Sequence, residues 1–386
     1  MTTLQQARTH AHDLGNSHRT PAQRLPIAAT MGATLAAPVI ARTAVPASAV
    51  SAMDGWVTAG PGPWRIDGQV RMGEAPRTPL MSGTARAVTT GGALPAGAAA
   101  VLRFERSRMA DGQLFATVTL EPGTDVRPAG EELALGEVIA AAGTTVTPGV
   151  VAAAAVGGVD DLDVRRPPRA RVIIIGDEII QHGIPAPGQV RDAFEIPVPA
   201  MLAARGISVV EVLHAGDDLN SVREALMRSD TDLIVTTGGT GRGDADYLAP
   251  AIAACGGTLE MRGVDVRPGH PTVLAEVADV PVLGLPGNPF AALGTLVAIG
   301  YPLIAGLLGA PLPLPQCRIA AQDLEGSRSA TRLLAVKDTD RGLITVGRQG
   351  AAMACVLAEA EALALIEPAG VPAGQQVKVL PLPWTG

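Results

Sequence analysis

The sequence predicts a multidomain α/β protein built around a parallel sheet, and three observations support this. Four compact apolar runs, Arg171–Ile175, Ile207–Leu213, Asp232–Thr236 and Val280–Leu285, alternate with helical patterns, as in parallel sheets with crossover helices. The chain has 386 residues, more than one core usually organises, so two to four domains are expected. A proline-rich linker at 311–315 (PLPLP) then separates this region from the rest of the chain.

Shorter strand patterns flank the α/β region. We expect an N-terminal region at 1–50 and 135–168, an inserted β domain at 51–134, the α/β domain at 169–311 and a C-terminal β domain at 312–386. The strand-like runs of the two β domains are Trp64–Val70, Ala98–Phe104, Leu114–Leu120, Arg318–Ala321, Arg332–Val336, Leu343–Val346, Ala362–Ile366 and Gln376–Leu380. The polar leader with His10, His12 and His18 lacks a signal peptide's apolar core, and it is expected to be mobile.

Composition argues against several classes of function. The net charge of −7 argues against a nucleic-acid surface. Three cysteines without metal-ligand spacing argue against a zinc site or a disulfide framework and favour the cytoplasm. The uncharged stretch Phe290–Ala310 is about long enough to span a bilayer, but Pro302 and the turn before it favour a buried helix. No membrane association is therefore expected.

The stretch Asp232–Tyr247 (DLIVTTGGTGRGDADY) runs from a strand pattern into a glycine-rich loop that ends on acidic residues. Four glycines between residues 238 and 243 let the backbone approach a ligand closely, and Asp244 can cap a helix that reaches Cys255. Backbone N–H groups at such a helix start attract phosphate. A turn without any ligand explains this loop equally well, so the other loops decide.

Acidic or turn-forming residues follow the other strands too. Asp177 and Glu178 come after the first strand, Asp217 and Asp218 after the second, and LPGNP (285–289) after the last. In a right-handed parallel sheet these positions meet at the carboxyl edge, where open α/β folds bind ligands. A single Asp after a strand usually caps the next helix, but the recurrence across loops favours a ligand site.

Carboxylates beside a phosphate seat need a compensating cation. Mg²⁺ prefers oxygen ligands and bridges protein carboxylates to phosphates, so we expect a Mg²⁺-like ion here. Arg242 and Arg262 supply positive charge, as do Arg267 and His270 in the rigid RPGHP turn, although a lone surface arginine is usually only solvated.

Several motifs occur in the order and spacing of a known family. They are SAMDG (Ser51–Gly55), TGG followed by LPAGAAAVL, GDE after a strand, TTGGTGRGDADY, RPGHP and LPGNP. From about Ala37 to the C-terminus the chain resembles the MoeA-type molybdopterin molybdenumtransferases, which include the E domain of gephyrin. A related adenylyltransferase resembles only the α/β part, and SAMDG counts against that assignment.

The resemblance implies insertion of molybdate into adenylylated molybdopterin, with release of AMP and molybdenum cofactor. It also implies a molybdopterin-binding type of α/β domain, a small C-terminal β-barrel and an N-terminal dimerisation region. In the implied homodimer, the cleft joins the α/β domain of one subunit to the inserted domain of the other. A molybdopterin adenylyltransferase is the partner that could deliver the substrate.

The resemblance also carries site residues onto this sequence. The implied catalytic residues are Asp54, Thr90, Glu132, Glu178, Asp217, Asp218, Asp246 and Arg267. The implied cofactor-binding residues are Arg127, Thr237, Gly238, Gly239, Thr240, Gly243, Asp244, His270, Pro286, Gly287, Asn288 and Pro289. Glu178, Asp218 and Asp246 are the expected metal ligands. No nucleophile with an adjacent base stands out, so the expected mechanism is positioning and electrostatics.

The chain departs from the family pattern at several places. Arg267 and His270 stand where lysines are common, and Glu132 replaces an aspartate. The serine-bearing glycine loop becomes TGRG, the serine-rich loop becomes QGAAMAC (349–355), and RDAF (191–194) lacks an asparagine. The chain is thus expected to be a divergent member. A pterin-binding or scaffolding paralogue without efficient insertion remains the alternative.

Overall fold

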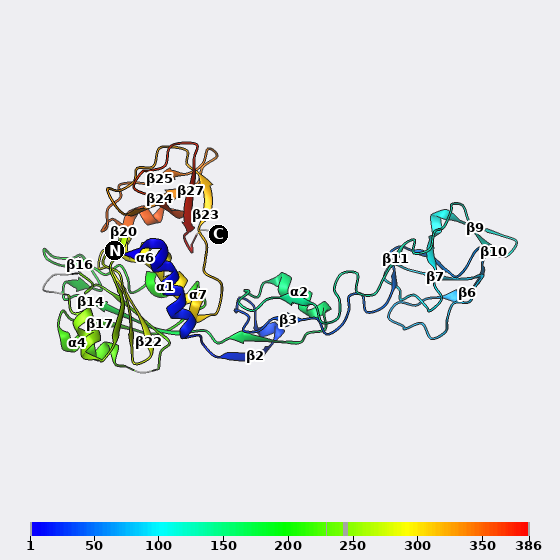
Figure 1. Ribbon diagram of the computed structural model, residues 1–386, viewed down its shortest axis with the longest axis horizontal. Coiled ribbons are helices and arrows are strands. Elements are labelled where there is room, and N and C mark those ends of the chain that lie inside the picture. Colours follow the sequence, from blue (N-terminus) through cyan, green and yellow to red (C-terminus); the bar gives the residue numbers. More distant parts are fainter. Residues whose placement is uncertain (1, 229, 242–245, 385–386) are drawn as a thin grey trace.

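The computed structural model describes residues 2–228, 230–241 and 246–384. The chain forms an elongated molecule, in which an α/β domain and a C-terminal β domain lie at one end and an inserted β domain lies at the other (Figure 1). A narrow arm, residues 21–50 and 128–168, joins the two ends. The chain runs out along this arm and returns along it, so the inserted domain is carried far from the α/β domain.

The α/β domain contains a six-stranded sheet in the order β17-β14-β18-β22-β21-β19. Its strands are β14 (Arg169–Ile175), β17 (Ser208–Ala215), β18 (Leu233–Thr237), β19 (Thr258–Arg262), β21 (Val273–Val277) and β22 (Val280–Leu285). The four strands that the sequence predicted are parallel, and β21 and β19 add antiparallel strands. Because β14 lies between β17 and β18, the strand order reverses there, which creates a topological switch point.

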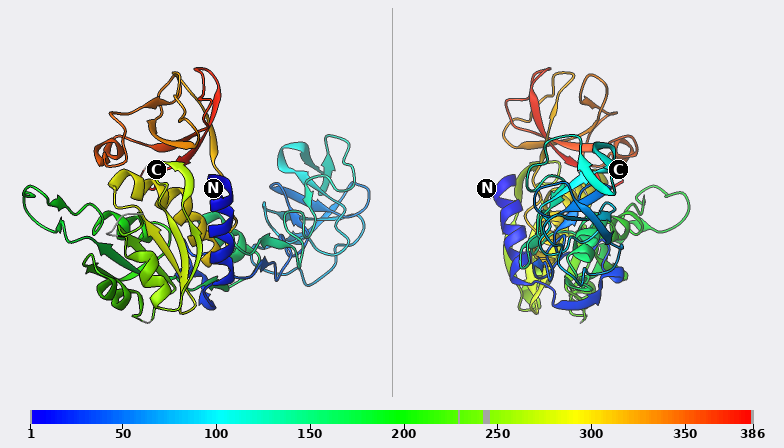
Figure 2. Two further views of the ribbon diagram at one scale, coloured as in Figure 1. Left: turned by 60° about the vertical axis from the view of Figure 1, so that its left-hand side comes forward. Right: turned by 90° about the vertical axis from the view of Figure 1, so that its right-hand side faces the viewer.

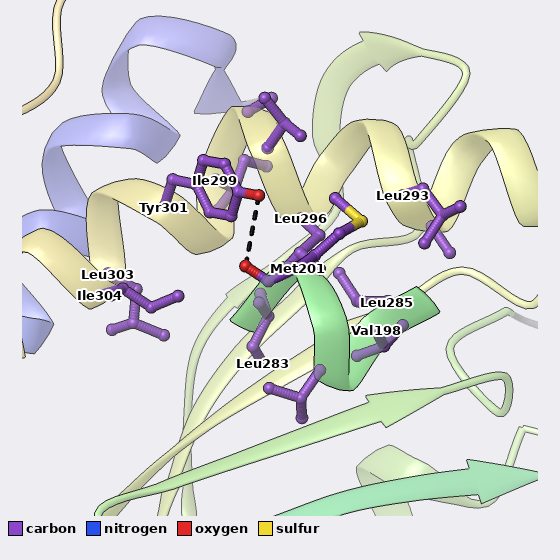
Figure 3. Close-up of a cluster of buried hydrophobic side chains, with 14 of the residues drawn as sticks. Val198, Met201, Leu283, Leu285, Leu293, Leu296, Ile299, Tyr301, Leu303 and Ile304 are labelled. Carbon is purple, nitrogen blue, oxygen red and sulfur yellow. Dashed lines mark hydrogen bonds between the residues drawn. The ribbon is translucent and has the colours of Figure 1, made fainter. Parts of the chain in front are cut away.

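The helices of this domain cover the sheet. They are α3 (Pro197–Ala203), α4 (Leu219–Leu226), α5 (Leu248–Ala254), α6 (Pro289–Thr295), the π-helical turn η3 (Leu296–Gly300) and α7 (Tyr301–Leu307). The continuous helix Pro289–Leu307 is long and apolar enough to cross a membrane, but it is wholly buried inside the protein. It packs against α3 and the sheet, and the Tyr301 hydroxyl donates to the Met201 carbonyl at 3.5 Å (Figure 3). The prediction of a buried helix is confirmed.

The N-terminal leader is not the mobile segment that its polarity predicted. It forms β1 (Thr2–Thr3) and α1 (Leu4–Ser17), which packs along α7. Leu4, Ala7, Ala11 and Leu14 recur at helical spacing and are buried. A Cβ atom on Gly15 would lie 2.1 Å from a carbonyl oxygen of α7, so glycine allows the close approach of the two helices. The prediction was wrong because small residues, which read as weakly apolar, form this interface.

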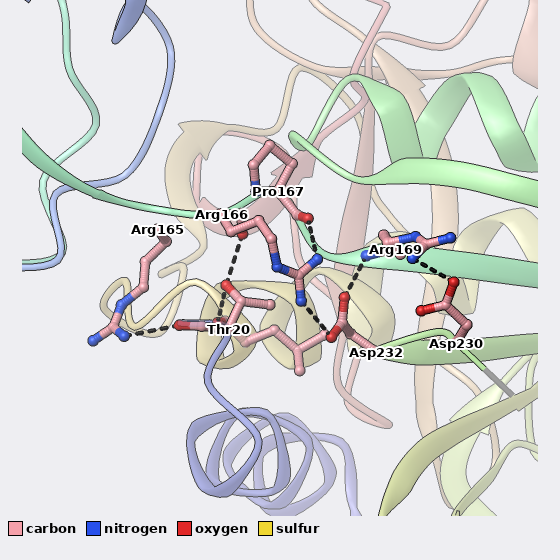
Figure 4. A network of polar contacts seen from close by, with 8 residues as sticks. Thr20, Arg165, Arg166, Pro167, Arg169, Asp230 and Asp232 are labelled. Carbon is pink, nitrogen blue, oxygen red and sulfur yellow. Dashed lines mark hydrogen bonds and ion pairs between the residues drawn. The ribbon is translucent and has the colours of Figure 1, made fainter. Parts of the chain in front are cut away.

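The arm is built from paired strands and one helix. Its elements are β2 (Ala22–Pro26), η1 (Ile27–Ala29), β3 (Val39–Ile40), β12 (Val138–Ala140), α2 (Pro148–Val156) and β13 (Asp161–Arg165). Polar contacts fasten its base to the α/β domain (Figure 4). Arg166 pairs with Asp232 at 2.7 Å, and Asp232 also accepts the backbone N–H of Arg169 at 2.7 Å. The Thr20 hydroxyl donates to the Arg166 carbonyl at 2.7 Å.

The inserted domain contains a four-stranded sheet in the order β6-β7-β5-β8 and two short strand pairs. Its elements are β4 (Val50–Ser51), β5 (Gly55–Thr58), β6 (Arg65–Gln69), β7 (Thr84–Val88), β8 (Ala100–Arg103), η2 (Phe104–Arg106), β9 (Ser107–Ala110), β10 (Gln113–Ala116) and β11 (Val126–Arg127).

The C-terminal sheet follows the path β1-β20-β24-β26-β27-β23, with β25 paired to β24. Its elements are β20 (Val264–Arg267), β23 (Gln316–Ile319), β24 (Thr331–Lys337), β25 (Ile344–Thr345), η4 (Ala354–Ala358), β26 (Ala362–Ile366) and β27 (Gln376–Pro381). A further pair, β15 (Ile179–Ile180) with β16 (Val190–Arg191), belongs to the α/β domain. Two strands from earlier in the chain, β1 and β20, continue the C-terminal sheet. That this sheet closes into a barrel stays a prediction.

Candidate functional site

Two of the predicted loops meet at the carboxyl edge of the α/β sheet. Gly238 and Gly239 follow β18 with φ of 83° and 63°, a region that residues other than glycine rarely adopt. A Cβ atom on Gly238 would lie 2.5 Å from the Ile175 carbonyl oxygen, and one on Gly287 would lie 3.4 Å from the Gly238 Cα. The glycine loop and the LPGNP turn are therefore neighbours, as the parallel topology predicted.

The polar groups of the glycine loop are only partly satisfied. Thr237 and Thr240 are buried, and the Thr237 hydroxyl has no hydrogen-bond partner in the described part of the chain. Gly243 and Asp244 lie outside the described residues. The following helix α5 begins only at Leu248, and Tyr247 precedes it without a side-chain cap. A phosphate seat here would rest on the loop backbone and the free hydroxyl rather than on a helix start.

The acidic residues after β14 and β17 converge on the same edge. The Asp177 backbone N–H donates to the Asp217 carboxylate at 3.1 Å, and a Cβ on Gly216 would lie 2.9 Å from an Asp177 carboxylate oxygen. Asp218 caps α4 by accepting the Ser221 N–H at 2.9 Å, so the simpler capping role is realised at this position. None of the ion pairs of the described residues involves Asp177, Glu178, Asp217 or Asp218, which leaves this edge negatively charged.

Asp246 is an acid of the predicted set whose side chain is buried. Its side chain is 6% exposed and pairs with Arg262, which also donates to the Gly241 carbonyl at 3.1 Å. The other carboxylate oxygen has no partner among the residues that the structure describes. Burial raises the pKa of Asp246, and the Arg262 guanidinium lowers it by a smaller amount. Such a carboxylate has a free oxygen that a cation or a donor group of a ligand could use.

The three expected metal ligands do not form a preassembled cluster. Within the described ranges, only Asp192, Glu195 and His214 form a cluster of three or more potential metal ligands. Their ligand atoms all lie within 4.8 Å of one another. Mg²⁺ commonly takes one or two protein carboxylates and completes its shell with phosphate oxygens and waters. The unpaired acids and the free Asp246 oxygen fit such an ion.

A cavity of about 610 Å³ opens between the α/β and C-terminal domains, beside the LPGNP turn. It is lined by RPGHP (267–271), Pro286 and Asn288 on one side and by Ser327, Arg332 and residues 349–351 on the other. None of the described Asp and Glu residues lines it. Arg267 and Arg332 occupy paired positions on the neighbouring parallel strands β20 and β24. The cavity is therefore suited to an anion.

Two further contacts shape this cavity. The Val264 carbonyl accepts from Nδ1 of His270 at 2.7 Å, so Nδ1 carries the proton in the neutral ring and Nε2 can accept a hydrogen bond. The Gln349 amide exchanges two 2.7 Å bonds with the Ala335 backbone and holds its loop against β24. Two of the family departures, RPGHP and QGAAMAC, thus face one space. Sequence reasoning missed Arg332 and Ser327, because the register that aligns β24 with β20 is not visible in local patterns.

The remaining predicted residues form a second group at the inner end of the inserted domain. The Thr90 backbone N–H and hydroxyl both donate to one Asp54 oxygen, at 2.7 and 2.9 Å, and these bonds lower the pKa of Asp54. Arg127 pairs with Glu131 at 2.6 Å and lies 3.7 Å from Glu132. Pairing of β11 with β4 places Arg127 opposite Val50, close to SAMDG.

Within one chain these two groups lie at opposite ends of the molecule. The arm separates the inserted domain from the α/β and C-terminal domains in both the front and the turned view (Figures 1 and 2). A single subunit therefore cannot close Asp54 and Thr90 over the glycine loop in this conformation.

Comparison with known proteins gives consistent matches. Residues 2–158 match the family described as the MoeA N-terminal region (domain I and II), and residues 171–306 match a probable molybdopterin binding domain. Molybdopterin molybdenumtransferase 2 of Mycobacterium tuberculosis is 31% identical over 309 residues, covering 75% of this chain and 76% of that protein. The molybdopterin molybdenumtransferase of Nostoc sp. is 28% identical over 297 residues, which cover 73% of this chain and 68% of that protein. A crystal structure of a molybdopterin biosynthesis MoeA protein from Pyrococcus horikosii covers 99% of both chains with a TM-score of 0.80 at 23% identity, which supports the fold.

Proposed function

The chain belongs to the molybdopterin molybdenumtransferase family, and we propose that it inserts molybdate into adenylylated molybdopterin with release of AMP, as a transferase of molybdenum cofactor biosynthesis. One observation carries the proposal. The LPGNP turn borders both the glycine loop and the cavity with Arg267 and Arg332, which no described acid lines, so a phosphate seat and an anion site adjoin. A substrate held at its phosphates would thus present its other end to a second anion.

The protein's contribution is to position and to neutralise charge. The glycine-loop backbone and the Thr237 hydroxyl hold the diphosphate, while Arg267, Arg332 and the His270 ring attract molybdate into the cavity. Loss of AMP breaks the bond that joins the AMP phosphorus to the pterin phosphate, and water or a molybdate oxygen supplies the replacing oxygen. The residues of this chain hold the phosphate group while that exchange takes place.

We propose Mg²⁺ as the ion that balances the acidic edge. Asp246 through its free oxygen, together with Glu178 or Asp218, would hold it. When bound, such an ion neutralises phosphate charge and aligns the leaving phosphate. Asp218 would keep its cap to α4 through one oxygen and offer the other.

We also propose that the active unit is a homodimer in which the inserted domain of one copy covers the α/β edge of the other. The separation of the Asp54 and Thr90 pair from the glycine loop within one chain supports it (Figure 1). Thr90 would position Asp54, since both of its donors fix the same carboxylate oxygen. The cytoplasm is the proposed compartment, and an adenylyltransferase the proposed supplier of substrate.

Release of AMP separates this function from the alternative of a pterin-binding paralogue. Purified protein with adenylylated molybdopterin and Mg²⁺ should release AMP only when molybdate is added. Arg267→Gln should raise the molybdate concentration that this release requires. Tight binding of the adenylylated pterin with no release of AMP at any molybdate concentration would support the paralogue instead.

A further inference from the structure

A second large cavity lies at the base of the arm. Its volume is about 760 Å³, within the range of small-molecule sites. Pro167 and Gly206, which precede β14 and β17, place it at the amino edge of the sheet, opposite the site described above. Helices α1 and α7, arm residues 29–34 and the linker at 310–314 complete its walls. Several separate parts of the chain therefore meet around it.

The charged groups of this cavity have one sign only. Arg8, Arg165 and Arg205 line it, and no Asp or Glu in the described part of the chain does. The whole chain carries a net charge of −7, so three arginines without an acid are unexpected here. The rest of the wall is largely apolar and includes Tyr301 and Leu308. The cavity thus combines a cationic part with an apolar part.

Arg8 is a buried cation without a counter-ion. The residue is 1% exposed, and it forms no ion pair with any described carboxylate. Its two terminal nitrogens donate to the carbonyls of Ala298 and Pro313, while Nε–H has no partner among the described residues. Burial lowers the pKa of Arg8 to about 10. Buried charges in proteins are ordinarily paired, because an isolated one is costly.

The other two arginines of the cavity are less buried than Arg8. Arg165 donates one terminal nitrogen to the Thr20 carbonyl at 2.9 Å (Figure 4), and its buried Nε–H has no partner in the described chain. The Arg205 guanidinium is exposed and stacks on the ring of Tyr301, 4.3 Å from the centroid. Neither arginine pairs with a described carboxylate.

A purely structural role explains part of these observations. Arg8 fastens the π-helical turn η3 to the linker, since such a turn leaves carbonyls without their helical partners. That role accounts for its two terminal nitrogens. It does not account for two unpartnered Nε–H groups or for the gathering of three arginines without an acid around one cavity.

We propose that this cavity binds a small organic anion with an apolar body, such as a medium-chain carboxylate. The arginines hold the anionic group, and the apolar body lies against Tyr301, Leu308 and the linker. Because the arm and the α/β domain both contribute walls, the bound anion also stabilises one orientation of the arm. This site is independent of the proposed transferase function, and its test needs no pterin substrate.

Calorimetric titration of the full chain with octanoate and with octanol, at constant ionic strength, tests the proposal. The two probes share an apolar tail and differ in charge. Octanoate should bind one molecule per chain, at least about tenfold more tightly than octanol does. Arg165→Gln and Arg205→Gln should each weaken octanoate binding about fivefold or more and leave octanol unchanged. Arg341→Gln removes the same charge from an exposed turn outside the cavity and should change nothing. Arg8 is left intact, because its loss would release two backbone segments.

Hydrogen exchange supplies a second readout that locates the binding. Octanoate should slow exchange in residues 29–34 and 310–314 and leave the inserted-domain sheet unchanged. The proposal is overturned if octanoate does not saturate, if octanol binds equally well, or if Arg341→Gln weakens binding as much as the cavity variants do.

Discussion

Replacing Arg262 by Gln tests whether this arginine stabilises the charged form of the buried Asp246. The change removes the cation that pairs with a carboxylate whose side chain is only 6% exposed. Breaking a fully buried pair costs about 3–5 kcal/mol, and an exposed pair is worth ~0.2–1 kcal/mol. Because the Arg262 side chain is 42% exposed, we expect a cost between these limits, about 1–2 kcal/mol at neutral pH.

The pH dependence of this cost has a definite sign. Burial already raises the pKa of Asp246 in the folded protein, and losing Arg262 removes the group that opposes this rise. A raised carboxyl pKa means that the native state holds the proton more tightly than the unfolded chain does, so stability falls as pH rises through the window between the two values. The cost of Arg262→Gln is therefore largest at neutral pH, and it should shrink as Asp246 becomes protonated in acid.

Thermal unfolding measured at pH 7.5 and at pH 4.5 gives the comparison. The transition that includes the α/β domain should fall by about 2–8 °C at the higher pH and by less at the lower one. Adding Asp246→Asn to Arg262→Gln should recover part of the loss at pH 7.5, because no buried charge is then left unpaired. Arg228→Gln is the matched control, since Glu211 keeps its pairing with Arg171. An equal loss at both pH values, or no loss at pH 7.5, would refute the reasoning.

Three other predictions address the site and its scaffold. Asp54→Ala and Glu178→Ala should each abolish AMP release. After subunit exchange, a mixture of the two inactive variants should regain part of the activity, because each mixed dimer keeps one of its two composite sites intact. Exchanged dimers that recover no activity would contradict the shared cleft. Arg332→Gln should raise the KM for molybdate about tenfold with a smaller change in kcat, as expected for a group that attracts the anion, and an unchanged KM would remove Arg332 from the cavity's function. Gly238→Ala should destabilise the protein by about 3 kcal/mol or more, since it adds a clash with a carbonyl oxygen to the strain of a positive φ. Gly183→Ala, at a similar φ in open space, is the control and should cost about 1 kcal/mol. Equal melting temperatures for the two variants would count against the tight contact at Gly238.

The central sheet could be predicted from the sequence because its strands are local and strongly apolar. The four parallel strands were found at nearly their observed bounds, and the meeting of the Gly238 loop with the LPGNP turn followed from topology alone. The same reasoning left Asp218 between two roles, and the structure shows that it caps α4. Local patterns thus place residues at the carboxyl edge of the sheet, but they do not determine which hydrogen bonds each side chain forms there.

The features that were missed depend on contacts between distant segments. Arg332 reaches the cavity only because β24 pairs with β20, about 65 residues earlier in the chain, and that register has no local signal. The pairing of Arg262 with Asp246 depends likewise on how the edge strand β19 lies beside the glycine loop. Helix α1 was missed because half of its buried residues are alanine or glycine, whose burial is decided by the partner helix.

Reconstitution of a cofactor-free molybdoenzyme tests the central claim most directly. The purified protein, adenylylated molybdopterin, Mg²⁺ and limiting molybdate should together activate the apoenzyme, with one AMP released for each active site that is formed. If the adenylylated pterin binds but the apoenzyme stays inactive and no AMP appears when molybdate is added, the chain does not insert molybdenum.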